Sequence, residues 1–104
     1  MELEKIRQYI NKKTGALEDL PFGPDALVFK VLKKMFALVA WGETPLRITL
    51  KCDPHRAEML RIQYKAVQPG YYMNKQHWNT ITLDGSIDES EILSWIDHSY
   101  DLVV

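Results

Sequence analysis

Residues 69–80 carry the densest group of side chains able to bind or act on a ligand. They read Pro-Gly-Tyr-Tyr-Met-Asn-Lys-Gln-His-Trp-Asn-Thr, which combines large aromatic rings, a lysine, a histidine and two asparagines. The rings can stack on bases, the lysine and histidine can meet negative charge, and the amides offer paired donors and acceptors. A hydrophobic core requires no such mixture, so this segment is the candidate working surface. Its candidate binding residues are Tyr72, Asn74, Lys75, His77 and Trp78.

A purely structural interpretation of the same segment stays open. Tyr71, Tyr72 and Trp78 can equally be half-buried strand and turn residues that close one end of the core, a frequent use of aromatic side chains. The two interpretations differ in one respect, because a binding surface requires the rings to share a solvent-facing patch with cations.

Charge is distributed unevenly along a chain whose net charge is only −1. Residues 30–83 carry nine Lys or Arg and three Asp or Glu, whereas residues 84–104 carry six Asp or Glu and no cation. A basic middle beside an acidic end points toward a polyanionic partner. The alternative is a protein whose charges balance in three dimensions.

Residues 46–51 alternate between apolar and polar side chains, as a half-buried strand does. The core face takes Leu46, Ile48 and Leu50, and the outer face takes Arg47, Thr49 and Lys51. The sequence therefore predicts a basic row on the open face of a sheet. Lys30 is assigned to the same basic surface, although the apolar pattern of its own strand does not show which face of the sheet it takes.

Hydrophobic periodicity and capping residues predict three helices and five strands. Asp53 before Pro54 is a strong helix start, because the carboxylate can accept backbone N–H groups and proline fits the first helical position. The predicted helices cover residues 2–13, residues 54–64, and a final segment that starts at a capping box near residues 86–91. The predicted strands cover residues 27–32, 35–41, 46–51, a segment from residue 67, and residues 79–83.

These elements predict a two-layer α+β fold in which residues 1–104 form one domain. The order is α-β-β-β-α-β-β-α. Its short connections predict an antiparallel five-stranded sheet with the helices on one face.

Several separate blocks of the sequence resemble the MmcQ/YjbR family, and they follow one another in that family's order. They include Pro-Phe-Gly-Pro-Asp at 21–25, Leu-Lys-Cys-Asp-Pro at 50–54 and Pro-Gly-Tyr-Tyr-Met-Asn-Lys at 69–75, with further blocks at 28–31, 34–38, 77–80, 83–85 and 96–100. The resemblance covers essentially the whole chain and implies a small domain of the secretion-chaperone-like arrangement. Members usually carry the label DNA-binding protein, which implies nucleic-acid binding but no catalytic or site residues. Gln76 departs from the pattern, which has Lys or Arg there.

Metal binding and catalysis are not predicted. Cys52 and His55 are three residues apart, but a zinc site needs about four ligands and no further pair accompanies them. Asp97 and His98 are neighbours on a predicted helix, where adjacent side chains diverge by about 100°. Without a glycine-rich phosphate loop either, the sequence predicts a non-enzyme that uses no cofactor.

The sequence also predicts a cytoplasmic protein. Its longest apolar stretch, residues 35–41, is too short to span a bilayer, and the start Met-Glu-Leu-Glu lacks the basic region of a secretory signal. A single cysteine, Cys52, cannot form an internal disulfide, which favours a reducing compartment.

The resulting hypothesis is weak and largely sequence-independent DNA binding. Its residues are Lys30, Arg47, Lys51, Tyr72, Asn74, Lys75, His77 and Trp78. The alternative is a protein- or peptide-binding adaptor, in which an extended peptide or a second copy of the chain meets a sheet face or edge. A small-ligand site is a further, less favoured alternative.

Overall fold

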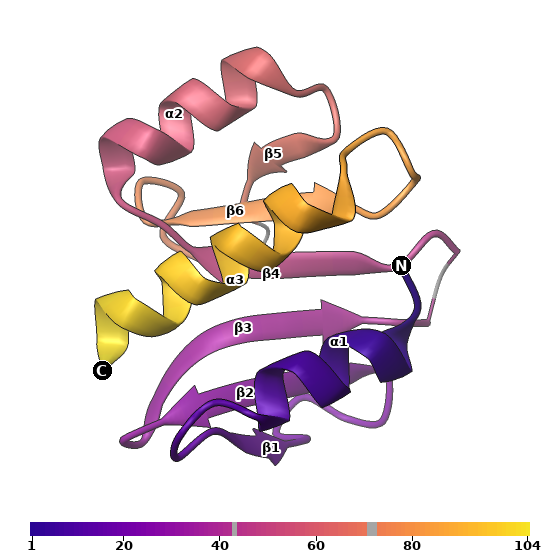
Figure 1. Cartoon of the computed structure of the whole chain (residues 1–104), viewed down its shortest axis with the longest axis vertical. Coiled ribbons are helices and arrows are strands. Elements are labelled where there is room, and N and C mark those ends of the chain that lie inside the picture. Colours follow the sequence, from indigo (N-terminus) through magenta and orange to yellow (C-terminus); the bar gives the residue numbers. More distant parts are fainter. Residues whose placement is uncertain (43, 71–72) are drawn as a thin grey trace.

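The computed structural model describes residues 1–42, 44–70 and 73–104. Within them, three helices and six strands form the predicted α+β fold (Figure 1). The helices are α1 (Leu3–Asn11), α2 (Pro54–Gln63) and α3 (Glu89–Val103). The strands are β1 (Leu17–Asp19), β2 (Ala26–Val31), β3 (Lys34–Ala40), β4 (Arg47–Lys51), β5 (Val67–Pro69) and β6 (Trp78–Thr82).

The strands pair antiparallel in one sheet, in the spatial order β1-β2-β3-β4-β6-β5. The prediction of five strands was wrong, because the sheet also contains β1. That strand has three residues, two of them acidic, so no alternating pattern marks it in the sequence. It forms because its residues pair with Lys30, Phe29 and Val28 of β2.

One face of the sheet is apolar and carries the helices. Leu27, Val39, Ile48, Ile81 and Val67 are successive cross-strand partners from β2 to β5, and each is buried. Cross-strand partners share a face, so this row is the floor of the core. Figure 1 shows α1 and α3 on the same side of the sheet, with α1 over β2 and β3 and α3 running across β4. The predicted placement of helices on one face is confirmed.

A bulge between β2 and β3 decides which side chains face outward. Phe29 pairs with Ala37 but Lys30 pairs with Met35, so Phe36 is the extra residue of β3. Phe36 is fully buried, with its ring edge-on to that of Tyr100 in α3 at a centroid distance of 5.4 Å. The bulge thereby keeps Lys30 and Met35 on the face away from the helices.

Lys13, just beyond α1, ties that helix to α3. Its ammonium nitrogen contacts Asp97 Oδ1 and lies 5.3 Å and 5.1 Å from the ring centroids of Tyr9 and Tyr100. The Tyr9 hydroxyl donates to the same Asp97 carboxylate at 2.8 Å. Burial, and then the Asp97 carboxylate, raise the pKa of Tyr9. Part of the negative charge of α3 is therefore balanced inside the helical layer.

The start of α2 has the capping geometry that the sequence predicts. Asp53 Oδ1 accepts the backbone N–H groups of His55 and Arg56 at 3.1 Å and 3.2 Å. Asp88 occupies the equivalent position of α3, but its side chain makes no cap hydrogen bond. The capping-box prediction for α3 was therefore wrong in its contacts, and the Ser86 hydroxyl donates instead to Asp84 at 2.6 Å.

Removing the Asp53 cap should destabilise the protein measurably. We expect Asp53→Ala to lower the free energy of unfolding by about 1 kcal/mol, because two backbone N–H groups lose their acceptor. Urea unfolding followed by circular dichroism measures the change. Asp88→Ala is the matched control, since it removes a carboxylate at the same helix position without breaking a cap bond. Equal losses in the two variants would contradict the assignment.

Candidate nucleic-acid interface

The sheet face opposite the helices carries three rows of cross-strand partners, and we call it the open face. One outer row holds Trp78 and Lys51 and, on the neighbouring strands, Met35, Lys30 and Leu17. The middle row holds Gln68, Thr80, Thr49, Leu38, Val28 and Asp19. The other outer row holds Thr82, Arg47, Ala40 and Ala26. No member of these rows belongs to the core cluster under the helices.

The centre of the open face is neutral and sealed by its own side chains. Val28 is fully buried and Thr49 is only 5% exposed, although no helix lies over them. The hydroxyls of Thr49 and Thr80 are 2.9 Å apart across β4 and β6 and hydrogen-bond to each other. The positive charges of the open face are therefore confined to its two outer rows.

Lys51 and Trp78 meet on this face as direct cross-strand partners. Both side chains are half-buried, so each keeps part of its surface in solvent. Lys51 makes no ion pair with any carboxylate in the described part of the chain. Arg47 lies exposed in the other outer row, as the alternation of residues 46–51 predicts.

Lys30 lies on the open face, where it forms an ion pair. Its ammonium nitrogen is 3.3 Å from Asp19 Oδ2, across the pair formed by β1 and β2. Lys30 was predicted to be an available cation because β1 was not among the predicted strands. Asp19 is placed beside Lys30 only by that missed strand.

In the loop that leads into β6, one predicted contact residue is exposed, and others make hydrogen bonds within the protein. Lys75 is exposed, and Asn74 Oδ1 already accepts the backbone N–H of Gln76 at 2.9 Å. The carbonyl of His77 accepts the backbone N–H of Cys52 at 2.7 Å. His77 itself is half-buried. Tyr72 lies outside the described residues. The loop therefore contributes Lys75 as its exposed cation, while Asn74 shapes the turn.

Arg61 of α2 holds this loop in place, a role that its sequence context did not reveal. Its Nη2 donates to the backbone carbonyls of Lys75 and Trp78, the latter at 3.2 Å. Its Nε donates to Asn79 Oδ1 at 2.6 Å, and Asn79 Nδ2 donates in turn to the carbonyl of Ala57 at 3.2 Å. In the sequence, a cation on the flank of a helix looks like a solvated surface residue. Its role becomes visible only when the fold places the loop beside it.

Gly70 allows the close approach that positions Trp78. The backbone N–H of Gly70 donates to the carbonyl of Trp78 at 2.7 Å. A Cβ atom at Gly70 would lie 2.6 Å from the Cβ of Trp78 and 3.0 Å from its carbonyl oxygen. Any side chain here would displace β6 from β5, so a residue without a Cβ is required.

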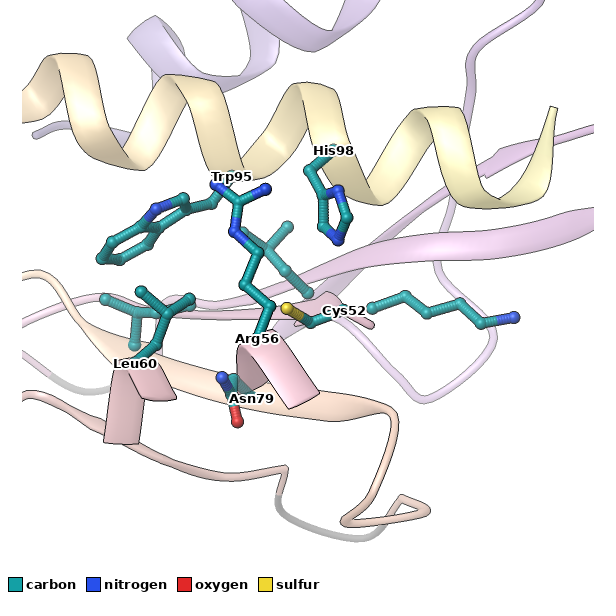
Figure 2. Close-up of a pocket in the computed structure, with 9 residues that line it drawn as sticks. Cys52, Arg56, Leu60, Asn79, Trp95 and His98 are labelled. Atoms are coloured by element: carbon teal, nitrogen blue, oxygen red, sulfur yellow. The ribbon is translucent and has the colours of Figure 1, made fainter. Parts of the chain in front are cut away.

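A small hollow lies between α2, α3 and the sheet (Figure 2). Its lining includes Cys52, Arg56, Leu60, Asn79, Trp95 and His98. Figure 2 shows Arg56 extending from α2 toward α3, between Trp95 and His98. The free space is about 10 Å³, room for about one water molecule. Ligand pockets are typically 300–1,000 Å³, so this hollow is a packing feature.

The side chain that shares the hollow with Cys52 is His98, not His55. His55 is exposed, whereas Cys52 is 5% exposed and His98 lines the same hollow. Burial raises the pKa of the Cys52 thiol, against the opposing effect of Arg56. A thiol with a raised pKa is a poor nucleophile at neutral pH.

His98 is held as a neutral acceptor. Its Nε2 accepts the backbone N–H of Asp53 at 3.3 Å, which links α3 to the cap of α2. Burial lowers the pKa of His98, and the Arg56 guanidinium lowers it further, whereas the Asp53 and Asp101 carboxylates oppose the shift. Protonation would place an N–H against the N–H of Asp53.

Two kinds of site are absent from the described residues. Among residues 1–42, 44–70 and 73–104, no three His, Cys, Asp or Glu side chains come together as a metal ion would require. Within the same ranges, the helices are all too short or too polar to traverse a bilayer.

The chain matches the YjbR family model over residues 11–102. Uncharacterized protein YjbR of Escherichia coli strain K12 is 36% identical over 104 residues, which cover all of this chain and 88% of that protein. The chain belongs to the YjbR family. The family resemblance predicted from the sequence blocks is therefore confirmed.

Other YjbR-like proteins agree with this assignment. Uncharacterized protein YyaQ of Bacillus subtilis strain 168 is 36% identical over 114 aligned positions, covering 95% of each chain. The crystal structure of Deinococcus radiodurans DR2400, with family-model domain DUF419, matches with a TM-score of 0.92 and 40% identity over 97% of this chain and 77% of that one. A crystal structure from Pseudomonas syringae matches over the full length of both chains with a TM-score of 0.85 and 30% identity. This YjbR chain thus shares its whole fold with solved structures.

Removing Arg61 should release the loop before β6. We expect Arg61→Ala to lower the free energy of unfolding by about 2 kcal/mol, because a buried amide oxygen and two carbonyls lose a charged donor. Amide hydrogen exchange at residues 74–78 should accelerate more than exchange in α1. Lys65→Ala is the matched control, since this exposed cation near the end of α2 makes no bond to the loop. Unchanged exchange in Arg61→Ala would contradict its positioning role.

The lowered pKa of His98 should make the protein less stable in mild acid. Because the folded pKa lies below the unfolded value of about 6.5, the unfolded chain binds the proton first. The contribution of neutral His98 is therefore complete above about pH 6.5 and is lost as the pH falls through the folded pKa. Urea unfolding at several pH values should show this loss in the parent chain, and a smaller loss in His98→Gln.

An NMR titration of the His98 ring provides a direct check on the same prediction. A midpoint at or above the ordinary histidine value would contradict the assignment of a half-buried neutral acceptor.

Proposed function

We propose that this YjbR-family chain is a non-catalytic, cytoplasmic DNA-binding protein that binds weakly and largely without sequence preference. The binding surface is the open face around Arg47, Lys51 and Trp78, together with Lys75 in the adjoining loop. The observation that carries the proposal is the direct pairing of Lys51 with Trp78 on a face without helices. A cation beside a ring offers phosphate neutralisation and base stacking at one point.

The separation of charge between the two faces supports this proposal. The acidic helix α3 packs on the opposite face, and two of its carboxylates are balanced there by Lys5 and Lys13. On the open face, Asp19 is the carboxylate of the three rows, and Lys30 balances it. A polyanion that approaches the open face therefore meets a local surplus of positive charge despite the net charge of −1.

The same geometry explains why the proposed binding is weak and unselective. Few cations face the ligand, and each phosphate contact contributes a limited, salt-sensitive share of the affinity. A protein reads DNA sequence through hydrogen bonds from its polar side chains to the base edges. The hydroxyls of Thr49 and Thr80 instead bond to each other. Asn74 is likewise engaged by its own turn.

A peptide-binding or self-associating adaptor is the second candidate, favoured by the apolar end of the open face. Leu17 is 70% exposed on the short edge strand β1. Met35 and Leu38 are half-buried on the same face. An extended segment could add to such an edge through backbone hydrogen bonds. This candidate requires Leu17, whereas DNA binding requires Lys51 and Lys75.

Fluorescence anisotropy with a labelled oligonucleotide across a salt series tests the DNA-binding proposal. Three or four phosphate contacts predict a slope of log K against log salt of about −3. The double variant Lys51→Glu, Lys75→Glu should bind less tightly and flatten that slope to about −1, because two contacts are lost. Lys12→Glu, compared with Lys51→Glu alone, is the control for charge, since each reverses one charge and Lys12 ends α1 on the helical side.

An equal effect of Lys12→Glu would show that net charge, and not the open face, governs binding. Absence of binding at low salt would overturn the proposal and favour the adaptor. Light scattering of Leu17→Glu beside the parent chain would then test self-association.

A further inference from the structure

We infer that the open face selects single-stranded DNA over duplex, with Trp78 as the platform on which a base stacks. This inference rests on the proposed DNA binding and adds the class of ligand. Its geometric basis is a ring with a neighbouring cation on a sheet face that carries no helix.

A six-stranded sheet is too wide to enter a duplex groove. Six strands have five spacings of about 4.8 Å, which gives a face about 24 Å wide, whereas the major groove of B-DNA is about 12 Å wide. That groove accepts a helix or a two-stranded ribbon. The helices α1 and α3 lie on the other side of the sheet and carry acidic residues (Figure 1).

Single-stranded DNA imposes no such width limit. Its bases are free to turn toward a surface, and its backbone can run along a row of cations while the bases lie on rings and apolar side chains. The outer row of the open face offers this combination, since Trp78 on β6 pairs directly with Lys51 on β4, and Met35 on β3 supplies an apolar side chain in the same row. A strand laid across the row meets a ring first and a cation next.

Trp78 is fixed well enough to serve as a platform. The carbonyl of Trp78 accepts hydrogen bonds from both Gly70 N–H and Arg61 Nη2, at 2.7 Å and 3.2 Å. Gly70 has no side chain to compete for the space beside it. The backbone that carries the indole is therefore held in position before any ligand arrives, so little backbone entropy remains to be lost on stacking.

Lys75 extends the basic path beyond the end of the row. Its side chain is exposed in the loop, and its backbone carbonyl is held by the same Arg61 that anchors Trp78. One arginine thus positions both the ring and the neighbouring loop cation. The polar contacts of Arg61 are with the protein backbone and Asn79, so we assign it a positioning role and not contact with DNA.

The test compares a fluorescein-labelled 12-nucleotide single strand of mixed sequence with its own duplex, at low salt, by anisotropy. We expect the full chain to bind the single strand at least about tenfold tighter. Trp78→Leu should weaken single-strand binding by about 5- to 150-fold, the usual loss for one stacked base, and should weaken duplex binding by a smaller factor, because paired bases cannot stack on the ring. Trp78→Phe keeps a ring and should retain most of the affinity.

Tryptophan fluorescence supplies an independent readout. The single strand should quench the emission of the parent chain, and the Trp78→Phe variant should show little quenching from the two remaining tryptophans, Trp41 and Trp95. Urea unfolding of both variants establishes that each is folded under the binding conditions.

The outcomes separate this inference from the proposed function. Duplex binding as tight as single-strand binding, or an equal loss for both ligands in Trp78→Leu, would overturn the single-strand inference and leave DNA binding in place. Binding of neither ligand would overturn both. Selective loss of single-strand affinity together with loss of quenching would support both.

Discussion

The antiparallel register between β4 and β6 decides what each face of the sheet presents. A slip of β6 by one residue along β4 would turn Trp78 toward the helices and Asn79 toward solvent, while Lys51 and Leu50 kept their faces. The two strands are separated in the chain by α2 and β5, so no short turn fixes their pairing. The register is instead held from both faces, by the Thr49–Thr80 hydroxyl bond and by the bonds of Arg61 to β6.

That register also separates the core from the open face. The core row from Leu27 to Val67 points into the helical layer, and the rows of the open face contribute nothing to the core cluster. Polar or basic residues can therefore occupy the open face without a burial cost, as long as the alternation is kept. The exceptions are Val28 and Thr49, which are buried by their neighbours on the open face itself.

The junction between α2 and α3 shows the opposite use of polar groups. Asp53, His98 and Cys52 gather near a hollow that has room for about one water molecule (Figure 2). Asp53 serves both as the cap of α2 and, through its N–H, as the donor to His98. These residues resemble catalytic types in the sequence, but the bond between Asp53 and His98 joins α3 to the start of α2, and the Cys52 thiol is buried. The chemistry of a side chain is thus set by its partners and its access to solvent.

The periodicity of the chain was enough to predict three helices, five of the strands, the helix-covered face and the side on which Arg47 and Lys51 lie. It failed at β1, whose three residues carry no alternation and form a strand only through pairing with β2. The ion pair of Lys30 was not predicted either, because Asp19 reaches Lys30 only across that strand pair. In the loop before β6, the bond from Gln76 N–H to Asn74 Oδ1 was likewise not predicted.

What the sequence alone determined is local: which residues alternate, where α2 is capped, and that cations concentrate in the middle of the chain. Only the tertiary structure decided which cations remain available, that Trp78 stands beside Lys51, and that Arg61 anchors a loop fourteen residues away. The reason is physical. Period and capping depend on neighbours within one or two turns of chain, whereas ion pairs and cross-strand contacts depend on which distant segments share a sheet.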